Sequence, residues 1–180
     1  FYGLAVLCTD DAEVAALAKK TPRHVMTYGL NEEADVRAED VQQHGPHMRF
    51  TLCLPDATRT PITLALPGRH NVLNALAAAS VAWQLGVAPE AIARALQNFA
   101  GVGRRFNLLG SPMTAKGATV QLVDDSGHHR KELEAVFAAA RGGWPDKRLV
   151  VAFQPHRYSR TRDLFAEFGA VLSSVGVLGL

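Results

Sequence analysis

The sequence predicts an α/β protein in two parts, and two observations carry this prediction. Strand-like and helix-like runs alternate along the 180 residues, most regularly in the second half. Such alternation is typical of a parallel sheet flanked by helices. The pattern also changes at Gly101–Gly103, where two glycines separate a helical period from a strand period. We therefore expect a domain boundary near residue 103.

The first part begins with a strand and a helix. Residues 2–8 form an apolar run that predicts a buried strand, and Thr9 or Asp10 is placed to cap the helix that follows. A second strand is expected at residues 24–30. Residues 34–68 contain β-favouring runs separated by Gly- and Pro-containing turns, which predicts an antiparallel meander.

Two helices are expected next. Val72, Leu76 and Ala79 recur at helical spacing, with a stop signal at Gly86. A second amphipathic helix has Pro89 in its first turn. The short connection between them predicts an antiparallel pair of helices.

Strands and helices alternate after the glycine linker. We expect strands at residues 105–109, 118–125 and 148–155, helices at 129–141 and 161–173, and the start of a further strand at the end. Polar residues follow two of these strands, namely Asp124, Asp125, His128 and His129 after one and His156, Arg157 and Arg160 after the other. Ligands of open parallel sheets bind at the carboxyl ends of the strands, so we expect these side chains to converge on one edge.

These residue types suit an anionic ligand. Arginine forks match phosphate and carboxylate groups, and an adjacent carboxylate pair is able to hold ribose hydroxyls or a hydrated Mg²⁺ ion. Structural interpretations stay open as well. Asp124 and Asp125 are placed to cap the following helix, and the histidines and arginines are also compatible with a solvated helix start.

The composition excludes several classes of protein. Hydrophobic residues make up 48% of the chain, and the formal net charge is only +2. Lys and Arg are dispersed, so we expect no nucleic-acid partner. We find no apolar run of about 18 residues and no signal peptide, and so expect a cytoplasmic protein without a membrane partner. Cys8 and Cys53 lie in apolar runs without metal-binding spacing, which favours buried thiols.

Four motifs in order resemble the Mur ligase family of peptidoglycan synthesis. They are LPGRHNVLNALAA, GVGRRFNLLG, DDSGHHRKE and QPHRYSRTRDL, and together they extend over most of the chain. The resemblance implies a partial P-loop-type central domain at residues 1–103, followed by a truncated Rossmann-like parallel-sheet C-terminal domain at residues 104–180. Because the chain starts at Phe1 and ends in an apolar run, we expect a piece of a longer protein.

The resemblance also implies a reaction and its cofactors. The full-length protein is expected to join L-alanine to UDP-N-acetylmuramate through an acyl phosphate, with ATP and Mg²⁺. It is expected to act as a monomer or weak homodimer. Asn71 and Asn74 fit the residues beside adenine, Asp125 the residue near the ribose, and Arg105 the arginine that reaches the ATP phosphates.

The remaining site residues fall on the amino-acid side. His128 and His129 fit the paired histidines of the reaction centre, with Arg105 also counted as catalytic. The residues that fit the grip on the amino acid are Ser126, His156, Arg157 and Arg160.

The departures from the family pattern limit what this chain is expected to do alone. The Gly-rich phosphate loop with its Lys-Thr pair is not in the sequence, and the Mg²⁺ ligands are expected outside it, so we predict that the polypeptide alone does not hydrolyse ATP. Ser126 stands where the family commonly has Tyr, and Arg130 where it has Pro. Two alternatives therefore stay open, a peptide-adding ligase of cell-wall recycling and a non-catalytic nucleotide-binding remnant.

Overall fold

The computed structural model describes residues 3–179, and the chain divides into two compact units. The first unit comprises residues 1–100 and the second residues 101–180. The division falls at the first glycine of the Gly101–Gly103 segment. Each unit has a hydrophobic core of its own.

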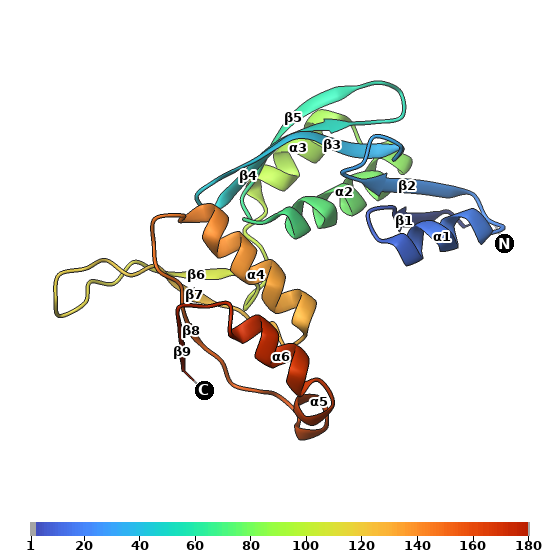
Figure 1. Ribbon diagram of the computed structural model, residues 1–180. Coiled ribbons are helices and arrows are strands. Elements are labelled where there is room, and N and C mark those ends of the chain that lie inside the picture. The colour runs from blue at the N-terminus through green and yellow to red at the C-terminus, as the bar shows by residue number, and fades with distance from the viewer. Residues whose placement is uncertain (1–2, 180) are drawn as a thin grey trace. The chain divides into compact units, whose positions relative to one another are not determined.

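A five-stranded sheet in the order β1-β2-β3-β4-β5 forms the first unit (Figure 1). Its strands are β1 (Ala5–Cys8), β2 (Val25–Gly29), β3 (Val36–His44), β4 (His47–Cys53) and β5 (Arg59–Leu64). The first three strands run parallel, whereas β3, β4 and β5 pair in antiparallel fashion. The predicted meander is therefore confirmed.

Two of the three helices in this unit pack their apolar faces against the sheet. The helices of the unit are α1 (Ala12–Lys20), α2 (Arg69–Gln84) and α3 (Pro89–Asn98). Along β4 the buried residues alternate, because successive side chains of a strand point to opposite faces. Met48 and Leu52 pack in the same core as Leu76 of α2 and Ile92 of α3. Val72, Leu76 and Ala79, which recur at helical spacing in the sequence, are thus among the residues that α2 buries.

Local backbone chemistry sets where the first two helices begin. The prediction that Thr9 or Asp10 caps α1 is wrong, because Asp11 accepts hydrogen bonds from the first-turn amides. The Asp10 carboxylate instead accepts from the Leu30 amide at 2.9 Å. Gly68 precedes α2 with a φ of +93°, a conformation that glycine adopts without the strain a Cβ would cause.

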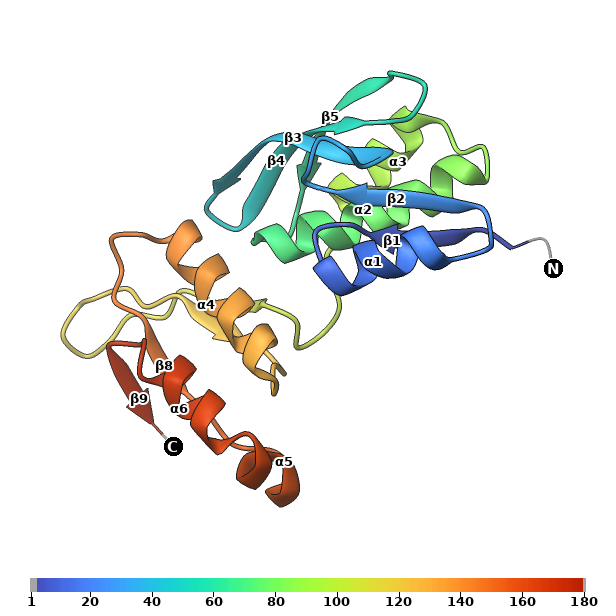
Figure 2. The same ribbon diagram turned by 45° about the vertical axis from the view of Figure 1, so that its right-hand side comes forward.

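The second unit contains two short two-stranded sheets and two packed helices. Its elements are β6 (Asn107–Gly110), β7 (Leu122–Asp124), α4 (Arg130–Gly143), β8 (Val150–Ala152), α5 (Tyr158–Asp163), α6 (Phe165–Leu172) and β9 (Val177–Gly179). β6 pairs with β7 in antiparallel fashion, and β8 pairs with β9 in parallel. Helices α4 and α6 lie side by side (Figure 2). Phe137 of α4, Phe168 of α6 and Phe153 share one core.

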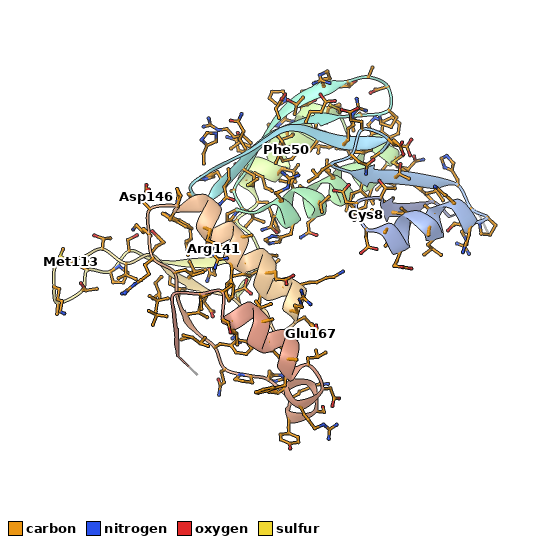
Figure 3. All side chains as sticks on the ribbon, in the orientation of Figure 1. Cys8, Phe50, Met113, Arg141, Asp146 and Glu167 are labelled. Carbon is orange, nitrogen blue, oxygen red and sulfur yellow. The ribbon has the colours of Figure 1, made fainter. Side chains whose placement is uncertain are left out.

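Three predicted elements of the second unit differ from the structure. The strand expected at residues 148–155 is reduced to the three residues of β8. The strand expected at residues 118–125 is reduced to β7, because the preceding residues form an exposed turn with Met113 near its tip (Figure 3). The single helix expected at residues 161–173 is two helices that meet at Leu164, whose ψ of 19° is not helical. The break lets α6 bury Phe168 and Leu172 in the core.

Within residues 3–179, no helix is both long enough and apolar enough to cross a membrane.

Candidate functional site

Four segments of the second unit bring polar side chains together. They are the loop after β7, the residues just before β6, the first turn of α4, and the loop after β8. We call this group the histidine site, and its members are Arg105, Asp125, Ser126, His128, His129, Glu132 and His156.

Asp125 joins two of these segments. One carboxylate oxygen accepts a hydrogen bond from the Phe106 amide at 2.8 Å, and the other accepts from the Gly127 amide at 2.6 Å. The Ser126 amide adds a third link by donating to the Arg104 carbonyl at 2.8 Å. Charge-assisted hydrogen bonds to backbone amides are stronger than neutral ones. Asp125 therefore holds the loop against the segment that carries Arg105.

Neither aspartate caps α4, contrary to the structural alternative that the sequence left open. The N-cap of α4 is His129. Asp124 lies 3.4 Å from the Arg104 guanidinium, in an ion pair whose arginine is 71% exposed. Asp125 binds the amides described above. The two adjacent carboxylates therefore have different surroundings, and only that of Asp125 ties backbone segments together.

Glu132 is the member of the site that the sequence prediction missed. Its Oε1 atom accepts from Arg105 Nη1 at 3.1 Å. Its Oε2 atom accepts from the backbone amides of His128 and His129 at 2.9 and 3.2 Å. A glutamate three residues after a helix start is typical of a capping box, and that spacing was the available signal. The ion pair with Arg105 has no such local signature.

The contacts of Glu132 lower the pKa of its carboxyl group. Partial burial raises this pKa, but the His128 amide and the Arg105 guanidinium lower it by more, so the net pKa lies below its usual value. A carboxyl group with a depressed folded-state pKa contributes stability that is fully present above its unfolded pKa. That contribution is lost as the pH falls through the folded-state pKa.

Acidification is therefore expected to reduce the contribution of Glu132 to stability. Above about pH 4.3, the usual pKa of an unfolded glutamate, the contribution is complete, and it declines below that pH. In thermal unfolding of the full-length protein, Glu132→Gln should be less stable than the wild type near neutral pH, and the gap should narrow on acidification. A gap that stays constant between neutral and acidic pH would contradict this expectation.

The imidazole of His128 lies at the centre of the site. Its Nδ1 atom is 2.8 Å from the Ser126 carbonyl oxygen, which only accepts hydrogen bonds, so Nδ1 carries the proton in this contact. In the neutral ring, Nε2 is then an acceptor. The ring centroid of His129 lies 4.8 Å from that of His128, and the centroid of His156 lies 6.4 Å from it.

The polar residues after β7 and β8 therefore approach each other through their histidines. This happens although β7 and β8 belong to different two-stranded sheets. Arg157, the residue after His156, has a φ of +67°, which is rare for a residue with a Cβ. Its carbonyl oxygen accepts a hydrogen bond from the Thr161 amide at 3.1 Å. The Arg157 side chain is exposed. The side chain of Arg160 lies outside the described part of the structure.

Asn71 and Asn74 lie in the first unit, on the first turns of α2. The side-chain amide of Asn71 donates to the Pro67 carbonyl at 2.8 Å. The Asn74 amide nitrogen is 3.4 Å from the Asn71 side-chain oxygen. The two asparagines thus share one face of the helix, as their spacing predicts. Asn74 is exposed and Asn71 is partly buried.

Arg105 is the member of the histidine site that suits the anionic ligand predicted from the sequence, since Asp125 and Glu132 are both acidic. Arg105 is half exposed, with 54% of its side chain accessible to solvent. Within residues 3–179, no group of three or more His, Cys, Asp or Glu side chains is arranged to hold a metal ion. The arrangement is able to bind an anion through Arg105 and to accept a proton at His128 Nε2.

Comparison with known sequences identifies similar proteins. Residues 1–82 match the Mur ligase middle domain. Over all 180 residues the chain is 77% identical to UDP-N-acetylmuramate–L-alanine ligase of Xanthomonas campestris pv. campestris strain B100. It is 76% identical to the ligase of the same name from Xanthomonas euvesicatoria pv. vesicatoria strain 85-10. In both cases the chain spans 38% of the length of the relative.

Solved structures show the same fold. The chain matches UDP-N-acetylmuramate-alanine ligase of Thermotoga maritima with a TM-score of 0.72 and 23% identity, covering 98% of this chain and 42% of that one. It matches MurF ligase of Thermotoga maritima in complex with ADP with a TM-score of 0.76 and 19% identity, covering 98% of this chain and 39% of that one. At these identities the likeness describes the fold alone.

Proposed function

This chain belongs to the Mur ligase family, and from that premise we propose that it is part of an ATP-dependent ligase that joins L-alanine to UDP-N-acetylmuramate. The observation that carries the proposal is the 77% identity to L-alanine ligases over the whole chain. In the proposed reaction the muramoyl carboxylate oxygen attacks the γ-phosphorus of ATP and ADP leaves. The amine of L-alanine then attacks the acyl phosphate, inorganic phosphate leaves, and the amine gives up a proton.

The histidine site is proposed to serve the second of these steps. His128 presents Nε2 as an acceptor because its Nδ1 proton is held by the Ser126 carbonyl, so His128 is proposed to take the proton of the amine. His129, whose ring lies beside that of His128, is proposed to take part in the same step. Ser126, His156, Arg157 and Arg160 are proposed to contact L-alanine, with the cationic groups gripping its carboxylate.

Four residues are proposed to contact the nucleotide. Asn71 and Asn74 are proposed to bind adenine, and Asp125 to lie near the ribose. Arg105 is proposed to contact the phosphates, where a guanidinium stabilises the charge that develops during phosphoryl transfer. Mg²⁺ is proposed to accompany ATP, with ligands from parts of the full-length protein outside these residues. The domain assignment of residues 1–103 and 104–180 to central and amino-acid-binding domains belongs to the same proposal.

The reaction is tested by product formation in the full-length protein. ADP release that depends on both UDP-N-acetylmuramate and L-alanine is the expected result. Turnover with a short peptide in preference to L-alanine would instead favour the peptide-adding alternative, which Ser126 keeps open. Absence of ADP release with any acceptor would favour the non-catalytic alternative.

His156→Ala tests the amino-acid side of the site. Loss of a hydrogen bond to the L-alanine carboxylate is expected to raise KM for L-alanine roughly tenfold or more, because hydrogen bonds to charged groups contribute about 1.5–3 kcal/mol. The KM for ATP should change little. The control is His44→Ala, which changes an exposed histidine at the end of β3 in the first unit. Equal KM values for L-alanine in the two variants would refute the role of His156.

A further inference from the structure

We propose that Glu132 is a positioning residue, which orients the Arg105 guanidinium and the His128–His129 backbone as one assembly. This inference rests on the proposed function of Arg105 in binding the ATP phosphates. Glu132 is the last residue of the DDSGHHRKE motif, but the motif assigns it no role, and its role follows from the geometry of its carboxylate.

The two oxygens of Glu132 divide their contacts between two segments. Oε1 binds Arg105, which is 27 residues earlier in the sequence, at 3.1 Å. Oε2 binds the amides of His128 and His129, directly before α4. A single carboxylate therefore links the residue proposed to contact phosphate with the backbone that carries both histidines. Any shift of one segment would be passed to the other through Glu132.

The contact leaves Arg105 able to bind an anion. Glu132 engages the Nη1 end of the guanidinium, which has five N–H donors in a planar fork. A partner at one end restricts the rotation of the fork without occupying the donors at its other end. Arg105 is half exposed, so its free rotation would otherwise be large. Restricting that rotation before the phosphate binds lowers the cost of ordering the side chain later.

A purely structural role is the alternative to exclude, because glutamate at this position also stabilises a helix start. The same helix offers a matched control. Glu134 forms an ion pair with Arg130 at 2.8 Å, and both side chains are about half exposed, at 47% and 51%. Glu134→Gln therefore removes a carboxylate two residues further along α4. It leaves every contact of the histidine site in place.

The experiment is a double-mutant cycle on kcat in the full-length protein. Glu132→Gln is expected to lower kcat roughly 10- to 100-fold, the scale of a misplacement of about 1 Å. In the Arg105→Ala background the same change should cause almost no further loss, because the group that it orients is already missing. Glu134→Gln should leave kcat unchanged in both backgrounds. Glu132→Asp, which keeps the charge, replaces Glu132→Gln in the cycle if the latter does not fold.

Each outcome separates the positioning role from the proposed function. If Glu132→Gln lowers kcat equally with and without Arg105, Glu132 acts through stability or through the histidines alone, and the positioning role is overturned. The positioning role is also overturned if Glu132→Gln lowers the unfolding temperature but leaves kcat unchanged. A wild-type protein that forms no amide bond would reject the proposed function, and the positioning role with it.

Discussion

Replacing Arg105 by alanine is expected, from the role proposed for it, to lower kcat of the full-length protein about 100- to 1000-fold, the usual cost of removing one group that stabilises developing charge. The reason is the position of its guanidinium. Glu132 holds one end of it at 3.1 Å, beside the loop that carries both histidines. The loss should be mainly in kcat, since the charge on the transferred phosphoryl group is redistributed in the transition state.

The adjacent arginine is a close control for this prediction. Arg104 has the same charge and is 71% exposed, and it pairs only loosely with Asp124 at 3.4 Å. Arg104→Ala removes one positive charge next to the same backbone, so it should reproduce any general electrostatic effect. Steady-state ADP release by both variants provides the measurement. If the two arginine variants lose turnover to the same extent, the specific role of Arg105 is wrong.

The second large effect is expected from Asp125→Ala, this time on stability. Each carboxylate oxygen of Asp125 accepts a hydrogen bond from a backbone amide, one from Phe106 and the other from Gly127. Leaving a partly buried amide without a partner costs about 1–3 kcal/mol, so with two amides affected the variant should lose about 2–6 kcal/mol in its free energy of unfolding. Water reaches part of this loop, which favours the lower end of that range.

Asp124→Ala is the matched control, since the two carboxylates are neighbours. Its ion pair with Arg104 is exposed, and surface pairs of this kind contribute at most about 1 kcal/mol. Denaturant unfolding of the full-length protein gives the comparison, with amide hydrogen exchange at Phe106 and Gly127 as the local readout. Faster exchange is expected only in the Asp125 variant. Equal destabilisation by both changes would contradict the bridging role.

The sheet of the first unit illustrates what local patterns predict well. Met48 and Leu52 alternate with solvent-facing residues along β4, and Leu76 recurs at helical spacing in α2. Each pattern reflects one face of one element, so it is readable without knowledge of the partner. The second unit was predicted less well. The break at Leu164 depends on packing between distant segments, which short windows of sequence do not contain.

Some residues of the candidate site could likewise be predicted from local sequence, and one could not. Asp125, His128 and His156 were predicted as neighbours because polar residues follow successive strands, and the 6.4 Å separation of the His128 and His156 rings agrees. Glu132 was missed because a glutamate in the first turn of a helix is usually a local cap. Nothing in the residues around it indicates a partner as far away as Arg105.

The sequence by itself determined the order of strands and helices in the first unit, the buried faces of those elements and the motifs that relate this chain to its family. Local periodicity and backbone preferences decide those features. Only the tertiary structure decided which groups meet at the histidine site. Asp125 reaches across 19 residues to Phe106, and Glu132 across 27 residues to Arg105. Contacts of that length depend on how the chain folds back on itself, and a carboxylate acquires its role from the partner that the fold brings to it.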